Sequence, residues 1–355
     1  MKAIGYLEAK AIDQPDALLN IELPMPVAIG RDVLVNVNAI SVNPVDTKIR
    51  RNAQPNEGEH KILGWDAVGE IVAIGDDVEH YKVGDKVWYA GDITRQGTNA
   101  EYHLVDERIV GKQPLTLSNT EAAALPLTAI TAWELLFDRL GFDRLGFNVI
   151  NDAASDQAAN EAKKPTDTRL LIVGASGGVG SILTQLAVKL TNATVIGTAS
   201  RKESQAWVTS LGADYVIDHS KSLTEELARI EISDVTHVIS LTHTDKHFDE
   251  IVEALAPQGQ LALIDDPQEP IDIMKLKRKS LSLHWELMFT RSMFQTADMD
   301  KQRQLLNAVS SLIDDGELVT TLGQNFGKIN AENLKKAHAY IESGKSIGKV
   351  VLEGF

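Results

Sequence analysis

The chain of 355 residues contains no cysteine, so it can form neither disulfides nor thiolate metal sites. Positive charge is also scarce. The 35 Lys and Arg are outnumbered by 50 Asp and Glu, and the net charge of −15 argues against a surface for nucleic acid or anionic membranes. No apolar run approaches the roughly 20 residues of a membrane span, and Met1–Tyr6 lacks the features of a signal peptide. These absences make a soluble, cytoplasmic enzyme the default expectation.

The length predicts two domains, and a hydrophobic content of 43% with 24% charged residues is that of a globular protein. Up to about residue 125, short apolar–polar alternations are separated by Gly, Asp and Asn, which predicts a compact β-rich domain. The expected strands are Asp32–Ile40, Gly64–Gly75, Val83–Ala90 and Ala100–Val105. Helical periodicity then begins at Thr120–Phe137, and the C-terminus adds helices at Gln302–Asp314 and Asn330–Ser343 and a strand at Gly348–Leu352. We expect this C-terminal part to return to the first domain.

A glycine-rich turn at 174–180 is the most informative motif. The apolar run Arg169–Val173 predicts a buried strand, and a helix is expected from Val179 to Leu190. A strand, a glycine turn and a helix N-terminus together bind a pyrophosphate, although Ala175 replaces the usual first glycine of the fingerprint. The residues expected to line the pyrophosphate are Gly174, Ser176, Gly177, Gly178, Val179 and Gly180.

Alternating strands and helices follow the turn and predict a doubly wound, parallel α/β sheet. Five further strands are expected at Thr194–Thr198, Asp214–Asp218, His237–Leu241, Gln260–Asp265 and Leu281–Leu287. Ligands of such sheets bind outside the carboxyl ends of the strands. We therefore expect the nicotinamide end of a dinucleotide to approach Leu241, Thr242, Ile264 and Asp265.

The end of the second strand predicts which dinucleotide is bound. NAD sites usually carry an acid about 20 residues beyond the glycine turn, whereas this position reads Ser200-Arg201-Lys202. A hydroxyl and two cations suit the 2′-phosphate of NADPH. With Thr198 and His219, they are expected to contact the adenosine end. The alternatives are that Ser200–Lys202 is an ordinary solvated helix start and that His219 is a surface histidine.

An exact repeat, Phe137–Gly141 followed by Phe142–Gly146, precedes a polar stretch that runs to Asp167. We interpret about 142–167 as an insertion that extends a helix and then loops over the surface. A lid function is the alternative.

Several segments together resemble the medium-chain dehydrogenase/reductase superfamily: the β-rich N-terminal third, the helix Pro126–Trp133, the glycine turn and the tail Glu342–Leu352. Within it, the chain resembles the zinc-independent quinone oxidoreductase branch, the relatives of zeta-crystallin, which are often labelled as zinc-type alcohol dehydrogenase-like. The resemblance implies a GroES-like catalytic domain at 1–125, joined by 292–355, and a Rossmann NADPH-binding domain at 126–291. It also implies a homodimer in which the sixth strand pairs with its symmetry mate.

The resemblance to this superfamily allows the residues at the zinc ligand positions to be compared. Zinc-dependent relatives have a cysteine where Asn43 stands and a histidine where Trp65 stands, so two ligand positions are lost. His60, His80 and His103 are scattered and are expected to be packed or solvated. No zinc is expected.

Without zinc, the expected reaction is hydride transfer from NADPH to a planar electrophile, either a quinone or an α,β-unsaturated carbonyl. Asn43, Trp65 and Thr128 are the candidate catalytic residues, and Gly348 and Lys349 match the closing motif of the family and are expected near the cofactor. Asp46 is interpreted as a turn cap. A zinc-type alcohol dehydrogenase and a non-catalytic NADPH-binding protein are the alternatives.

Overall fold

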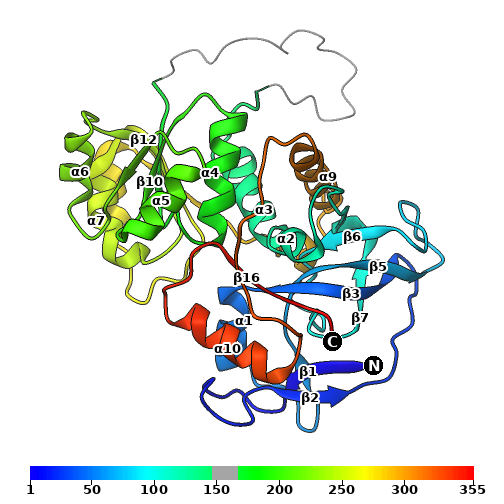
Figure 1. The fold of residues 1–355 in the computed structure, drawn as a ribbon. Coiled ribbons are helices and arrows are strands. Elements are labelled where there is room, and N and C mark those ends of the chain that lie inside the picture. The colour runs from blue at the N-terminus through cyan, green and yellow to red at the C-terminus, as the bar shows by residue number, and fades with distance from the viewer. Residues whose placement is uncertain (146–166) are drawn as a thin grey trace, which may run out of the picture. The chain divides into compact units, whose positions relative to one another are not determined.

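The computed structural model describes residues 1–145 and 167–355. It divides the chain into two compact units (Figure 1): unit 1 comprises Met1–Ile130 and Met288–Phe355, and unit 2 comprises Thr131–Leu287. The predicted boundaries at 125/126 and 291/292 lie a few residues from these. The predicted insertion at about 142–167 lies mostly outside the described residues. Within the described residues, no helix has the length and apolar character needed to cross a membrane.

Unit 2 is built around a six-stranded parallel sheet in the order β11-β10-β9-β12-β13-β14. Leu, Ile and Val of the strands and of the flanking helices form its buried core. This order confirms the predicted doubly wound fold, because the strand order reverses between β9 and β12. The strands are β9 (Arg169–Val173), β10 (Thr194–Thr198), β11 (Tyr215–Ile217), β12 (Val235–Ser240), β13 (Leu255–Leu263) and β14 (Ser282–Trp285). The helices are α4 (Gly178–Leu190), α5 (Lys202–Ser210), α6 (Leu223–Arg229), α7 (Thr244–Ala254) and the 3₁₀ turn η3 (Ile273–Lys279).

Unit 1 contains a three-stranded sheet, β2-β1-β4, and a seven-stranded sheet in which β15-β16-β3-β5-β6-β8 are neighbours and β7 also pairs with β3. The C-terminal β16 pairs antiparallel with β3, so the chain end returns to the first domain as predicted. The strands are β1 (Lys2–Tyr6), β2 (Leu19–Glu22), β3 (Asp32–Val42), β4 (Lys61–Ile62), β5 (Asp66–Ile74), β6 (Lys86–Tyr89), β7 (Tyr102–Asp106), β8 (Val110–Lys112), β15 (Leu322–Asn325) and β16 (Lys349–Glu353). The helices of this unit, apart from α3, are α1 (Pro44–Asn52), η1 (Glu107–Ile109), α2 (Asn119–Ala123), α8 (Thr290–Phe294), α9 (Lys301–Asp314) and α10 (Ala331–Glu342).

The helical run predicted at Thr120–Phe137 is broken rather than continuous. It consists of α2, α3 (Pro126–Trp133) and a π-helix, η2 (Glu134–Arg139). Pro126 has no N–H and disfavours helix at the residue before it, so a new helix starts there. The expected extension of the helix into the second copy of the repeat is wrong, because the π-helix ends at Arg139.

The two copies of the repeat differ in structure although their sequences are identical. The first copy completes the π-helix, and Gly141 then adopts a φ of +66°, which ends the helical path. The second copy is irregular over residues 142–145. There the Phe142 ring packs 4.6 Å from the ring of His237, and Arg144 lies 5.5 Å above the ring of Trp133. Tertiary contacts therefore decide the conformation of this pentapeptide.

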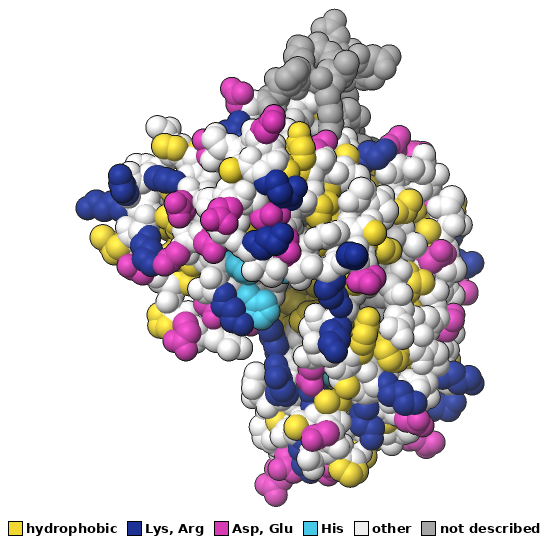
Figure 2. All heavy atoms as spheres, turned by 60° about the vertical axis from the view of Figure 1, so that its left-hand side comes forward, with side chains coloured by type: hydrophobic (Ala, Val, Ile, Leu, Met, Phe, Trp, Pro, Cys, Tyr) yellow, Lys and Arg dark blue, Asp and Glu magenta, His cyan; other side chains and the backbone are white. Residues whose placement is uncertain are grey.

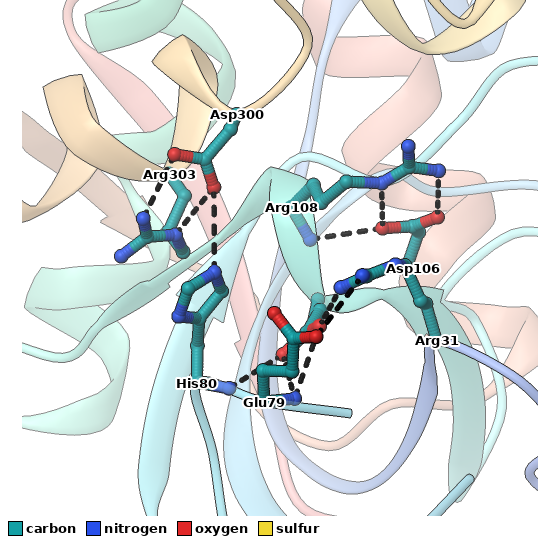
Figure 3. Close-up of polar contacts among 8 residues, drawn as sticks. Arg31, Glu79, His80, Asp106, Arg108, Asp300 and Arg303 are labelled. Atoms are coloured by element: carbon teal, nitrogen blue, oxygen red, sulfur yellow. Dashed lines mark hydrogen bonds and ion pairs between the residues drawn. The ribbon is translucent and has the colours of Figure 1, made fainter. Parts of the chain in front are cut away.

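An ion-pair network connects the loop after β5 with η1 and α9 in unit 1 (Figure 3). The carboxylate of Glu107 is fully buried and accepts hydrogen bonds from Arg31 Nη1 (2.7 Å) and from the N–H groups of Glu79 (2.9 Å) and His80 (2.7 Å). His80 Nε2 lies 3.9 Å from Asp300. The network fixes the backbone of His80 against Glu107 and places its ring next to Asp300.

The helices α1 and α10 lie side by side although almost 300 residues separate them (Figure 1). Between them Arg50 is fully buried and donates to Lys10 O and to Glu342. His338 on α10 is also fully buried, and neither ring nitrogen has a hydrogen-bond partner within the described residues. Burial, reinforced by Arg50, lowers the pKa of His338 to about 3.

We predict that His338→Leu stabilises the protein, and increasingly so in acid. The folded pKa of His338 lies below the unfolded value, so the unfolded chain binds the extra proton and stability falls as pH drops from about 6.5 toward 3. By pH 5 the loss from this residue is about 2 kcal/mol. Urea unfolding between pH 7 and pH 5 should therefore show a flatter profile for the variant, whereas parallel profiles would contradict the assignment.

Candidate active site

The glycine turn of unit 2 forms a narrow backbone cradle after β9. Gly174 has a φ of +86°, and a Cβ built there would lie 2.9 Å from Thr242 Cγ2, beyond the end of β12. A Cβ at Gly180 would lie 2.6 Å from the backbone of Ala175, so only glycine allows α4 to pack this closely. The nearest atom to a Cβ at Gly177 is 3.7 Å away. The turn therefore places α4 against the sheet and leaves space next to Gly177.

This cradle fits the pyrophosphate of a dinucleotide. Gly177 caps the 13-residue helix α4, and the first N–H groups of a helix have no acceptor within it. Ser176, Gly177, Gly178 and Val179 are partly exposed, so a phosphate can reach the N-terminus of α4. Ser181 Oγ donates to Gly177 O (2.7 Å) and accepts from Trp207 Nε1 (2.8 Å), which fixes α4 to α5. The sequence located this part of the site as a contiguous motif.

At the predicted adenosine end, the structure brings Thr198 and His219 together. Thr198 Oγ1 accepts from the N–H of Gly174 (3.0 Å) and lies 2.9 Å from His219 Nδ1. The side chains of Ser200, Arg201 and Lys202 are exposed where β10 continues into α5. Because β10 and β11 are parallel and Thr198 is in register with Ile217, these residues and His219 follow at the same edge of the sheet.

The residues predicted near the nicotinamide lie at the ends of β12 and β13. The N–H of Leu241 bonds to Val173 O (3.1 Å), which joins the ends of β12 and β9 at the point where the strand order reverses. Leu241, Thr242 and Ile264 are partly exposed. Asp265 instead accepts from the N–H (2.9 Å) and Oγ1 (2.5 Å) of Thr244 and so anchors the start of α7. The structure thus gives the Asp265 carboxylate a capping role.

Unit 1 contains a buried polar cluster centred on Asp66. Asp66 Oδ2 accepts from Lys349 Nζ (2.9 Å), Asn43 Nδ2 (2.8 Å) and Ser41 Oγ (2.7 Å), and Oδ1 accepts from the N–H of Leu127 (2.7 Å). Lys349 also donates to Asn43 Oδ1. The three polar partners of Asp66 Oδ2 are each 3% exposed or less, and Asp66 is fully buried. The buried carboxylate is thereby paired with one cation and neutral donors.

Sheet register produces this cluster. Ser41 on β3 faces Asp66 on β5, and β16 pairs with the same end of β3, so Val350 faces Val42. Lys349 and Asn43, the next residues outward, therefore come together. The sequence singled out Asn43 and Lys349 but missed Asp66 and Ser41. One signal could have identified Asp66. It directly follows Gly64-Trp65, and zinc-dependent relatives also have an acid at this position.

Asp46 shapes the turn that presents Asn43, in agreement with the prediction of a cap. Its carboxyl accepts from the N–H of Asn43 (2.6 Å) and of Gly64 (2.9 Å). Burial raises the pKa of Asp46 to about 7, the charge of Asp66 acts in the same direction, and these hydrogen bonds and Lys349 oppose the shift.

The other predicted residues of unit 1 are less accessible than expected. Trp65 is fully buried, donates to Asp92 O (3.1 Å) and meets the Phe289 ring edge-on at 5.8 Å, so its face is not open to a substrate in this structure. Thr128 is 2% exposed and donates to Leu125 O (3.0 Å). Gly348 has a φ of +62° in the turn before β16. The catalytic roles of Trp65 and Thr128 and the cofactor contact of Gly348 stay predictions.

The donor set does not fit zinc. Within residues 1–145 and 167–355, no group of three or more His, Cys, Asp or Glu is arranged to hold a metal ion. Asn43, which the resemblance aligns with the cysteine ligand of zinc-dependent relatives, instead donates to Asp66, as Lys349 also does. His103 lies elsewhere, with Nδ1 3.1 Å from Tyr89 Oη and Nε2 3.0 Å from Gln96 O.

Comparison with known proteins agrees with this architecture. Two family models match: the alcohol dehydrogenase GroES-like domain over residues 30–115, and zinc-binding dehydrogenase over residues 211–352. A zinc-type alcohol dehydrogenase-like protein of Staphylococcus aureus (strain MSSA476) is 38% identical over 352 residues, which cover 99% of each chain.

Solved structures give the same result. A crystal structure from Rhizobium etli CFN 42, named provisionally as a zinc-dependent alcohol dehydrogenase, is 53% identical with a TM-score of 0.91, and the match covers 100% of this chain and 98% of that one. Escherichia coli quinone oxidoreductase, solved with NADPH, shares the fold at a TM-score of 0.80 and 22% identity, over 99% of this chain and 100% of that one. The resemblance found in the sequence is thus confirmed: the chain belongs to the medium-chain dehydrogenase/reductase superfamily, among the zinc-type alcohol dehydrogenase-like proteins.

Proposed function

We propose that this protein is an NADPH-dependent, zinc-independent oxidoreductase that reduces a quinone or an α,β-unsaturated carbonyl. The observation that carries the proposal is the Asp66 cluster, in which Asn43, at a position where the resemblance implies a zinc ligand, and Lys349 both donate to Asp66. Oxidation of a simple alcohol needs a group that stabilises an alkoxide, which zinc supplies in those relatives. A conjugated acceptor is already electrophilic and needs less assistance.

The glycine cradle and the Asp66 cluster have different roles in the proposed reaction. The α4 N-terminus and the glycine cradle hold the pyrophosphate by N–H donors and the helix dipole. The bound nicotinamide supplies the hydride. Lys349 Nζ donates to Asn43 Oδ1 and Asp66 Oδ2, so the cluster holds this side chain in one buried position. The reduced substrate takes its proton from a side chain or water.

The test is NADPH oxidation, followed by its near-ultraviolet absorbance, with 1,4-benzoquinone, 9,10-phenanthrenequinone and a panel of enals, with and without a chelator. NADH is assayed in parallel. We expect turnover with NADPH that the chelator does not change and that exceeds turnover with NADH. Activity that requires added zinc would overturn the zinc-independent part of the proposal.

A zinc-type alcohol dehydrogenase is the second candidate, because the names of the relatives point to it. Stoichiometric zinc in the purified protein, with alcohol oxidation that disappears on chelation, would favour it. Tight NADPH binding without turnover would favour a non-catalytic role. A cytoplasmic location and a homodimer stay predictions from the sequence.

A further inference from the structure

Three histidines of unit 2 gather where β11 ends and α7 begins. His219 follows β11, His243 caps α7 in a left-handed conformation (φ +51°), and His247 lies on the first turn of α7. The rings of His219 and His247 meet edge-on, with centroids 5.9 Å apart. Figure 2 shows histidine side chains at the surface next to Lys or Arg side chains. Within the described residues this cluster is not a metal site.

Hydrogen bonding connects His219 to the cofactor cradle. Gly174 N–H donates to Thr198 Oγ1, and the same hydroxyl contacts His219 Nδ1 at 2.9 Å. This contact occupies Nδ1, and no hydrogen bond of His219 Nε2 is found within residues 1–145 and 167–355. The imidazole therefore has one nitrogen fixed by the protein and one left to donate to a ligand.

Burial and the neighbouring charges together lower the pKa of both rings. Burial lowers the pKa of His219 most strongly, His247 and His243 lower it further, and Asp218 opposes them. Burial also lowers the pKa of His247, with Glu250 and Asp245 opposing and His243 and Lys246 reinforcing the shift. An added dianion would favour the protonated rings.

We propose that His219 binds the 2′-phosphate of NADPH in its protonated form, with His247 as a positioning residue, so that binding of the 2′-phosphorylated cofactor takes up a proton. This inference rests on the proposed function. The phosphate would lie where β10 and β11 end, beside Ser200, Arg201 and Lys202, because parallel neighbours present their carboxyl ends at the same edge. NADH, which lacks this phosphate, would bind without the proton.

The proposed proton uptake can be measured through the pH dependence of cofactor binding. Uptake of one proton changes the Kd by up to about tenfold per pH unit, so NADPH binding should weaken between pH 6 and pH 8 while NADH binding changes little. The phosphate itself has a pKa of about 6 and loses its proton when it binds to cations, an effect of opposite sign. A histidine variant therefore has to be compared with the unchanged protein at each pH.

The experiment is titration calorimetry of 2′,5′-ADP and of 5′-AMP in two buffers with different ionisation enthalpies, which gives the protons taken up without any turnover. We expect uptake with 2′,5′-ADP only, its loss in His219→Gln, and a shift of its pH midpoint upward in His247→Gln, because one neighbour that opposes protonation is removed. His60→Gln, in unit 1, is the matched control and should behave as the unchanged protein.

Equal proton uptake in His219→Gln and in the unchanged protein would overturn this inference and leave the reductase proposal standing. If 2′,5′-ADP bound no better than 5′-AMP at any pH, the NADPH preference would fail together with it. Retained binding of 5′-AMP by the variants, which excludes misfolding, keeps either result interpretable.

Discussion

Lys349→Met is expected to destabilise the folded protein by about 3 kcal/mol, because it leaves the Asp66 carboxylate buried without its cation. Asp66 is fully buried, Lys349 is 3% exposed, and their charged atoms are 2.9 Å apart. The donors from Ser41, Asn43 and Leu127 remain, which places the cost at the lower end of the range for a broken buried pair. Urea unfolding at neutral pH measures it.

The control is Lys336→Met, which removes a lysine from the exposed i,i+4 pair with Glu332, where the two side chains are 57% and 77% exposed. We expect a change of about 0.5 kcal/mol or less. The double variant Asp66→Asn with Lys349→Met should recover much of the loss, since the amide needs no counter-charge. An equal cost for Lys349→Met and Lys336→Met would show that the cluster contributes no stability.

Gly177→Asp is expected to weaken cofactor binding strongly while the fold stays intact. The position caps α4 with φ −75°, and aspartate is among the best helix caps, so stability should be unchanged or slightly higher. A carboxylate about 4 Å from a phosphate costs about 4 kcal/mol at the effective dielectric of a protein surface. NADPH affinity should therefore fall on the order of 100- to 1000-fold, as measured by fluorescence titration.

Two further variants distinguish the effect of the added charge on NADPH binding from the effect of a larger side chain in the glycine turn. Gly177→Ser also caps a helix but carries no charge, so it should lose much less affinity. Gly180→Ala should act on the fold instead, because its methyl group would lie 2.6 Å from the Ala175 backbone, and crowding of this kind costs about 1–3 kcal/mol. Unchanged NADPH binding by Gly177→Asp would place the pyrophosphate elsewhere.

The sequence by itself determined the α/β fold class, the doubly wound sheet and the glycine cradle. These depend on short-range order: strand, turn and helix follow one another within residues 169–190, and each glycine acts through its own backbone. The strand order then follows from the short right-handed crossovers between parallel strands. The resemblance that aligns Asn43 and Trp65 with zinc ligand positions was visible for the same reason, since each stands in a local motif.

Only the tertiary structure decided the Asp66 cluster, the burial of Trp65 and the role of Asp265. Asp66 and Lys349 are brought into contact by the pairing of β5 and β16 on either side of β3, a register that no local pattern specifies. The repeated Phe-Asp-Arg-Leu-Gly segment shows most directly that local sequence does not fix conformation. One copy completes a π-helix, whereas residues 142–145 of the other are irregular. Local propensity is the same in both copies, so the different contacts of each copy determine its conformation.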